Sequence, residues 1–121
     1  MSLSSEEIVQ SIAKSIYDRK GMNIIAIDVR KLTSLTDFCI IAEGNVSRHL
    51  KALSSEITEQ LKAQGVAPVH VDGDMNSDWI VVDYGVVVVH LFIPEVRLKY
   101  RLEELWQEGE LVPLDIVMEE V

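Results

Sequence analysis

Paired carboxylates are the first residues of this chain whose spacing could do chemistry. Asp72-Gly-Asp74 has the Asp-x-Asp spacing, and Gly44-Asn-Val-Ser47 stands where a strand would pass into a helix. This layout is typical of a metal-dependent nucleotidyltransferase, in which two carboxylates hold divalent metals that activate the attacking oxygen. The pair lies in a turn-rich stretch, so a solvated acidic loop explains it as well. A nucleotidyltransferase that uses Asp72 and Asp74 is therefore kept as the alternative hypothesis.

The three histidines do not have the spacing of a metal site. No two of them lie four residues apart on a helix, and Cys39 is the only cysteine, so we expect no zinc site. His90 interrupts an apolar strand, where it is either a core residue hydrogen-bonded to a neighbouring carboxylate or backbone group, or a functional residue. Ser47, His90 and Asp83 could be written as a triad, but the chain has no Gly-x-Ser-x-Gly elbow. We predict no catalytic residue, no metal and no cofactor, and hence no enzyme.

The aromatic and acidic residues between positions 79 and 106 have a pattern that suits binding. Trp79, Val81 and Asp83 alternate in a predicted strand and share one of its faces, and Tyr84 follows directly. Trp and Tyr are favoured interface anchors because they bury a large area at a low entropy cost. The alternative is a Trp79 packed under a helix and a solvated Asp83. Arg97 and Tyr100, three apart on a predicted helix, either bond to this strand pair or contact a partner.

The elements that position these residues follow from periodicity and end signals. Ser4 and Glu7 predict a capping box for a first helix that ends at Gly21. Two apolar runs, 23–29 and 36–43, predict strands. Apolar residues stepping by three and four predict a second helix over about 46–64, with Asn45 as its N-cap.

A hairpin dominates the second half of the chain. The stretch 68–72 predicts a short edge strand, and 79–83 and 86–92 predict two strands joined by Tyr84-Gly85. The second of them is apolar except at His90, which predicts a central strand covered on both faces. Pro94 suits the start of a third helix with a stripe of Leu98, Leu102 and Leu105.

The predicted order is α-β-β-α-β-β-β-α, an α/β (α+β mixed) fold with a mixed sheet flanked by helices. We expect one domain over 1–108 and a C-terminal tail over 109–121, which either docks as an extra element or hangs loose.

Composition narrows the class of partner. The 121 residues are 48% apolar and 26% charged, which suits one folded domain. The net charge of -9 and the lack of a Lys/Arg run disfavour a direct grip on nucleic acid. The acidity either suits a basic protein partner or serves solubility alone. The N-terminus has no signal-peptide pattern and no apolar run reaches about 20 residues, so we expect a cytoplasmic protein without membrane contact.

An ordered set of short motifs resembles the ribosomal silencing factor family, also called Iojap-related proteins. The matching segments span about residues 5–107, in order and with short gaps. They are Thr36-Asp-Phe38, Ser47-Arg-His49, Asp72-Gly73, Trp79-Ile-Val-Val-Asp-Tyr-Gly85, Val87-Val-Val-His90, Arg97, Tyr100 and Leu102-Glu-Glu-Leu-Trp106.

This resemblance implies a nucleotidyltransferase-like fold without known catalysis. It implies binding to the large ribosomal subunit through ribosomal protein fourteen, which would block subunit association and repress translation under nutrient limitation. It also implies that a homodimer can form. The binding residues that it implies are Trp79, Asp83, Tyr84, His90, Arg97 and Tyr100.

One position departs from the family pattern. Val86 stands where the family usually has an acidic or polar residue, which puts one salt bridge to a basic partner in doubt. A third hypothesis, besides the silencing factor and the nucleotidyltransferase, is a structural dimerisation protein with the Val86–Phe92 region near a two-fold axis.

Overall fold

The computed structural model describes residues 3–101, 104 and 106–114. The first helix, α1 (Ser5–Asp18), begins as its sequence predicts. The Ser4 hydroxyl accepts the Glu7 backbone N–H at 3.1 Å, and the Glu7 carboxylate accepts the Ser4 N–H at 3.0 Å. The predicted capping box is therefore confirmed.

Eight elements follow α1, and the first seven have the predicted order. They are β1 (Met22–Asp28), β2 (Phe38–Glu43), α2 (Ser47–Ala63), β3 (His70–Asp72), β4 (Trp79–Asp83), β5 (Val87–Phe92), α3 (Pro94–Tyr100) and β6 (Glu110–Leu111). The last strand lies in the predicted tail, so that part of the tail docks onto the sheet.

The predicted N-cap of α2 is wrong. Val46 occupies that position, and it makes no side-chain cap hydrogen bond. The Asn45 backbone N–H instead donates to Nδ1 of His49 at 2.9 Å, while Nε2 of His49 lies 2.8 Å from the Arg19 carbonyl oxygen. A histidine ring that bridges two loops thus shapes the start of this helix.

The strands form one mixed sheet in the order β3-β4-β5-β2-β1-β6. Only the central β2–β5 pair is parallel, and the other neighbours are antiparallel. This arrangement confirms the mixed α/β class.

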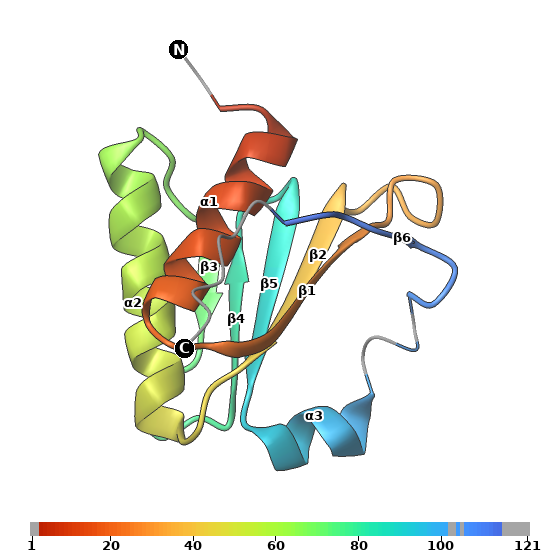
Figure 1. Ribbon diagram of the computed structural model, residues 1–121. Helices are drawn as coiled ribbons and strands as arrows, with labels where there is room; N and C mark the ends of the chain where they lie inside the picture. The colour runs from red at the N-terminus through yellow and green to blue at the C-terminus, as the bar shows by residue number, and fades with distance from the viewer. Residues whose placement is uncertain (1–2, 102–103, 105, 115–121) are drawn as a thin grey trace, which may run out of the picture.

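One face of the sheet is covered by two helices. In Figure 1, α1 and α2 lie side by side across that face, and α3 lies at one end of the sheet. The apolar stripes of α1 and α2 pack onto alternate strand residues that are fully or almost fully buried. These strand residues are Ala26, Phe38, Ile40, Ala42, Ile80, Val82, Val87, Val89 and Leu91.

The described residues cover the opposite face over only part of its width. A smaller cluster of Ile27, Val29, Cys39, Ile41 and Phe92 is buried there, with Val96 of α3 and Trp106 packed against it. Val88 and His90 on the same face are only half-buried.

Two predictions about this side are therefore wrong. Among the described residues, β5 is not fully covered on its second face, because Val88 and His90 are only half-buried there and α3 contacts one end of the sheet. Leu98 is 70% exposed rather than part of a core stripe. The other two leucines of the predicted stripe, Leu102 and Leu105, lie outside the described residues.

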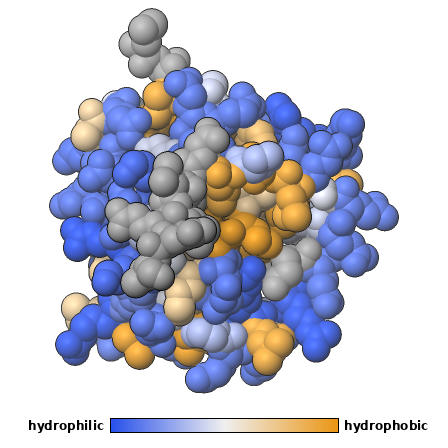
Figure 2. All heavy atoms as spheres, viewed as in Figure 1, coloured by the Kyte–Doolittle hydropathy of each residue, from blue (hydrophilic) through white to orange (hydrophobic). Residues whose placement is uncertain are grey.

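The surface on the side of β1 is mostly hydrophilic. Figure 2 shows an apolar patch near the middle of this side and smaller ones toward its lower edge. Among the described helices, none has the length and apolar character to cross a bilayer.

Candidate protein-binding face

Five half-buried side chains form what we call the open face, which consists of Trp79, Val81, Asp83, Val88 and His90. Side chains alternate between the faces of a strand, so the odd-numbered residues of β4 share one face. The register pairs Val81 with His90 and Asp83 with Val88, which places all five on the side away from α1 and α2. None of the helices α1, α2 and α3 buries this apolar surface, which carries one carboxylate.

Trp79 stands at the centre of an aromatic cluster. Its ring centroid lies 4.7 Å from that of Phe92, 5.1 Å from Tyr100 and 5.9 Å from His90. The indole N–H donates to Nδ1 of His90 at 3.1 Å. Tyr100 is 54% exposed, so the cluster connects the covered part of this sheet face to the surface.

His90 is held in its neutral form. Burial lowers the pKa of this imidazole from 6.5 to about 4, and the nearby charge of Asp83 opposes the shift. Since Nδ1 accepts the indole N–H, the neutral ring carries its own proton on Nε2. His90 is a hydrogen-bonded histidine, as one of the two sequence hypotheses expected, but its partner is Trp79.

Asp83 is both a charge and a turn-forming residue. Its Oδ1 accepts the Gly85 N–H at 2.7 Å, which closes the hairpin turn in which Gly85 has a φ of +81°. Glycine tolerates this left-handed conformation without strain. The turn therefore fixes a carboxylate at the end of the open face.

A cavity of about 460 Å³ adjoins the open face. Thr33, Leu35 and Thr36 line it from the β1–β2 connection, and Val69 lines it from the segment before β3. Leu35 is 87% exposed and Val69 75% exposed, so two apolar side chains stand at its rim. Cys39 also lines it, and burial raises the pKa of that thiol to about 12, so the group stays a neutral thiol at neutral pH.

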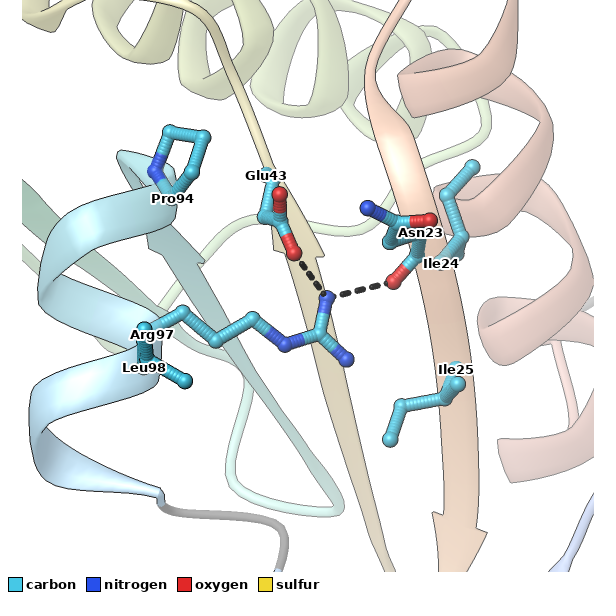
Figure 3. Close-up of a pocket in the computed structure, with 7 residues that line it drawn as sticks. All are labelled: Asn23, Ile24, Ile25, Glu43, Pro94, Arg97 and Leu98. Atoms are coloured by element: carbon cyan, nitrogen blue, oxygen red, sulfur yellow. Dashed lines mark hydrogen bonds and ion pairs between the residues drawn. The ribbon is translucent and has the colours of Figure 1, made fainter.

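Two residues that the family resemblance implies for binding lie elsewhere. Tyr84 is 7% exposed and packs in the core under α1 and α2, because it follows Asp83 directly and points to the other face. Arg97 is 9% exposed. Its Nη1 donates to the Glu43 carboxylate at 3.0 Å and to the Asn23 carbonyl at 2.6 Å, as Figure 3 shows.

Arg97 therefore joins α3 to β1 and β2. It also lines a cavity of about 720 Å³ with Asn23, Ile24, Ile25, Glu43 and Leu98 (Figure 3). Asn23 has a φ of +50°, and its backbone breaks the β1–β2 register. This irregular backbone presents the carbonyl that the guanidinium reaches.

The carboxylates of the nucleotidyltransferase hypothesis have local roles. Asp72 ends an exposed edge strand, and Oδ1 of Asp74 accepts the Asn76 N–H at 2.8 Å within its own turn. Within the described part of the chain, no three His, Cys, Asp or Glu residues are grouped to hold a metal. The Ser47 hydroxyl donates to Asp78 at 2.8 Å, so the triad arrangement with His90 does not form.

Sequence reasoning placed Val81 on this face with Trp79 and Asp83, but it missed three other apolar members of the region, namely Leu35, Val69 and Val88. The signal for Val88 is present in the sequence. It alternates with core residues in β5, as Val81 does in β4. The positions of Leu35 and Val69 depend on how two connecting segments lie over the sheet, which has no local signature.

Comparisons with known proteins converge on one family. The family model described as "Ribosomal silencing factor during starvation" matches residues 2–121. A relative named "Ribosomal silencing factor RsfS" from Chromobacterium violaceum is 41% identical over 101 residues, covering 84% of this chain and 83% of the relative. One of the same name from Bacillus subtilis is 30% identical over 116 residues, covering 96% and 98%.

A mouse relative is named "Mitochondrial assembly of ribosomal large subunit protein 1". It is 31% identical over 101 residues, which cover 81% of this chain and 44% of that protein.

Solved structures give the same result. A crystal structure of a Chromobacterium violaceum protein matches with a TM-score of 0.83 and 37% identity, covering 95% of both chains. One from Bacillus halodurans matches with a TM-score of 0.79 and 28% identity, covering 90% of this chain and 99% of that one.

Proposed function

We propose that this chain, which belongs to the ribosomal silencing factor family, binds the large ribosomal subunit through ribosomal protein fourteen and blocks subunit association. Translation would be repressed in this way when nutrients are limiting. The protein would act in the cytoplasm by occupying a surface, without catalysis. The observation that carries the proposal is the open face, an apolar sheet surface that the described helices leave half-exposed and that ends in a fixed carboxylate.

The chemistry of the open face suits a basic protein. Trp79 offers an aromatic anchor already packed on Phe92 and Tyr100, so binding would order few side chains. Asp83 offers a negative charge whose position is set by the hairpin turn. The overall charge of -9 would favour encounter with a basic ribosomal protein and would disfavour contact with rRNA phosphates.

We assign fewer residues to direct contact with the partner than the family resemblance implies. We assign Trp79, Asp83 and Tyr100 to direct contact, with Leu35 and Val69 at the rim. Tyr84 and Arg97 are buried, so we assign them to the scaffold. Val86 is 38% exposed beside the turn and would add apolar area instead of a salt bridge.

Co-sedimentation with purified large subunits tests the proposal. Asp83→Asn removes the charge but keeps an oxygen that can accept the Gly85 N–H, so the turn should survive. Loss of one partner of a buried charge pair costs about 2–5 kcal/mol, so binding should weaken at least tenfold. Asp83→Lys should weaken it further. Glu59→Gln on the exposed side of α2 makes the same charge change far from the open face and should bind normally.

Two outcomes would contradict the proposal in different ways. Equal binding by wild type, Asp83→Asn and Asp83→Lys would remove the open face from the interface. No binding by the wild type at micromolar concentration would remove the function itself.

A homodimer is a further part of this proposal. Val87, Val89 and Leu91 of β5 are fully buried under the helices, so only the Val88–His90 side of that strand could meet a second copy. A dimer built there would compete with the ribosome for the same surface. Light scattering of wild type and Val88→Lys would show a mass that halves in the variant, whereas a wild-type monomer would contradict this part.

A further inference from the structure

We propose that His90 is a positioning residue, whose neutral imidazole holds the Trp79 indole in the orientation that receives a protein partner. The part that concerns binding rests on the proposed function. The part that concerns geometry is a property of the free protein and can be tested without a ribosome.

The indole ring of Trp79 has a single hydrogen-bond donor. Trp has one N–H and no acceptor, and here that N–H donates to Nδ1 of His90 at 3.1 Å. Trp79 is half-buried, so an indole turned away from His90 would have to find water or leave its donor unpaired. The hydrogen bond therefore selects one indole orientation among those that the aromatic contacts alone would permit.

His90 is itself fixed from two sides. Its ring is nearly parallel to that of Phe92, with 6.1 Å between centroids and 12° between planes. Its backbone pairs with Val81 in β4 and with Ile41 in β2, so the residue lies in a central strand. A rigid acceptor in the sheet thus orients a half-exposed anchor on its surface.

Protonation would abolish this constraint. A charged imidazolium carries a hydrogen on both ring nitrogens, so its Nδ1–H would face the indole N–H and two donors would oppose each other. Among the described residues, Asp83 of β4 favours the charged form of His90, and Cys39 of β2 lines the same cavity as a neutral thiol. Tyr100 of α3 contacts the Trp79 ring.

Burial outweighs Asp83, because the pKa of His90 lies at about 4 rather than 6.5. The acceptor is consequently available throughout the neutral range. The arrangement keeps a histidine next to a carboxylate without letting it take up the proton.

Nuclear magnetic resonance of the free protein tests the geometric part. The Trp79 indole N–H resonance, told apart by comparison with Trp106→Phe, should shift with the same midpoint as the His90 ring nitrogens, near pH 4. The His90 nitrogen shifts at neutral pH should show the proton on Nε2. An indole resonance that does not follow the titration of His90, or a proton on Nδ1 at neutral pH, would overturn the inference.

A pair of variants tests the binding part. His90→Phe keeps an aromatic ring on Phe92 but removes the acceptor, whereas His90→Asn places an amide oxygen near the position of Nδ1. His90→Phe should lose about five- to tenfold in affinity for large subunits, and His90→Asn should recover most of that loss. Thermal melts establish that both variants fold.

The outcomes separate this inference from the proposed function. Equal affinity of folded His90→Phe and wild type would overturn the positioning role while leaving the proposed function intact. If wild type does not bind at all, the proposed function fails, and the resonance titration still decides whether His90 orients Trp79.

Discussion

The two faces of the sheet use the same strands for different purposes. On the side of α1 and α2, strand residues such as Ile40, Ile80 and Val89 are completely buried. On the other side, their neighbours in β4 and β5 are half-buried and include a carboxylate and a histidine. A fold needs one well-packed face to be stable, so the second face can keep residues that a core would reject. The four changes below test how separate the two faces are.

The largest loss of stability should come from replacing Arg97, which bonds α3 to the sheet. Arg97→Met leaves the Glu43 carboxylate and the Asn23 carbonyl without this donor, and breaking a buried ion pair costs about 3–5 kcal/mol. Urea unfolding measures the loss. Arg97→Met with Glu43→Leu should recover much of it, since an apolar pair replaces the buried charges. If Arg97→Met alone were as stable as wild type, the bonds from Arg97 to the sheet would not be needed to hold α3.

The next largest effect should be the difference in stability cost between truncating a side chain on the helix-covered face and truncating one on the open face. Ile40→Ala on the helix-covered face should cost about 2–5 kcal/mol, because the site is completely buried. Val81→Ala on the open face removes less apolar contact and should cost about 1 kcal/mol or less. Urea midpoints of both variants test the difference. Equal losses of stability would mean that the open face is packed as tightly as the helix-covered face.

Acid should lower the stability of the folded protein through protonation of His90 on the open face. Its folded-state pKa of about 4 lies below the unfolded value of 6.5, so the unfolded chain takes up the proton first as the pH falls. This contribution to stability is complete above about pH 6.5 and is lost progressively between pH 6.5 and 4. The melting temperature of wild type, compared with that of His90→Asn over this range, isolates it. Parallel curves for the two proteins would contradict the shifted pKa.

The smallest change in stability should come from replacing Tyr84 on the helix-covered face. Among the described residues, its buried hydroxyl has no hydrogen-bond partner, and burial raises its pKa to about 12. Tyr84→Phe removes an unpaired polar group and should raise the free energy of unfolding by about 1 kcal/mol. Ribosome binding should not change. Weaker binding by a folded Tyr84→Phe would return this residue to the interface.

Much of the fold was predictable because its signals are local. The capping box at Ser4 and the hairpin turn at Gly85 each depend on residues within a few positions. β6 was not predicted, since a strand of two residues is defined only by its pairing with Ile27 and Asp28, far away in the chain. The detailed likeness to a nucleotidyltransferase and the domain boundary at 108 stay predictions.

The site was predictable in part, for the same reason. Strand alternation placed Trp79 and Asp83 on one face, and applied to the next position it would also have placed Tyr84 on the opposite one. The burial of Arg97 could not be foreseen, because it depends on an irregular backbone at Asn23 and on Glu43 in another strand. The resemblance to a family correctly identified the family, but it did not separate surface residues from scaffold residues.

The buried cysteine has a practical consequence for experiments on single molecules. Cys39 is 2% exposed and its thiol stays protonated at neutral pH, so a maleimide dye should leave it unmodified in the folded protein. A cysteine introduced at Glu59 on α2 would then be the one reactive thiol, and the natural cysteine need not be replaced. A dye at that position would report the arrival of this protein on a tethered ribosomal subunit while leaving Trp79 and Asp83 clear.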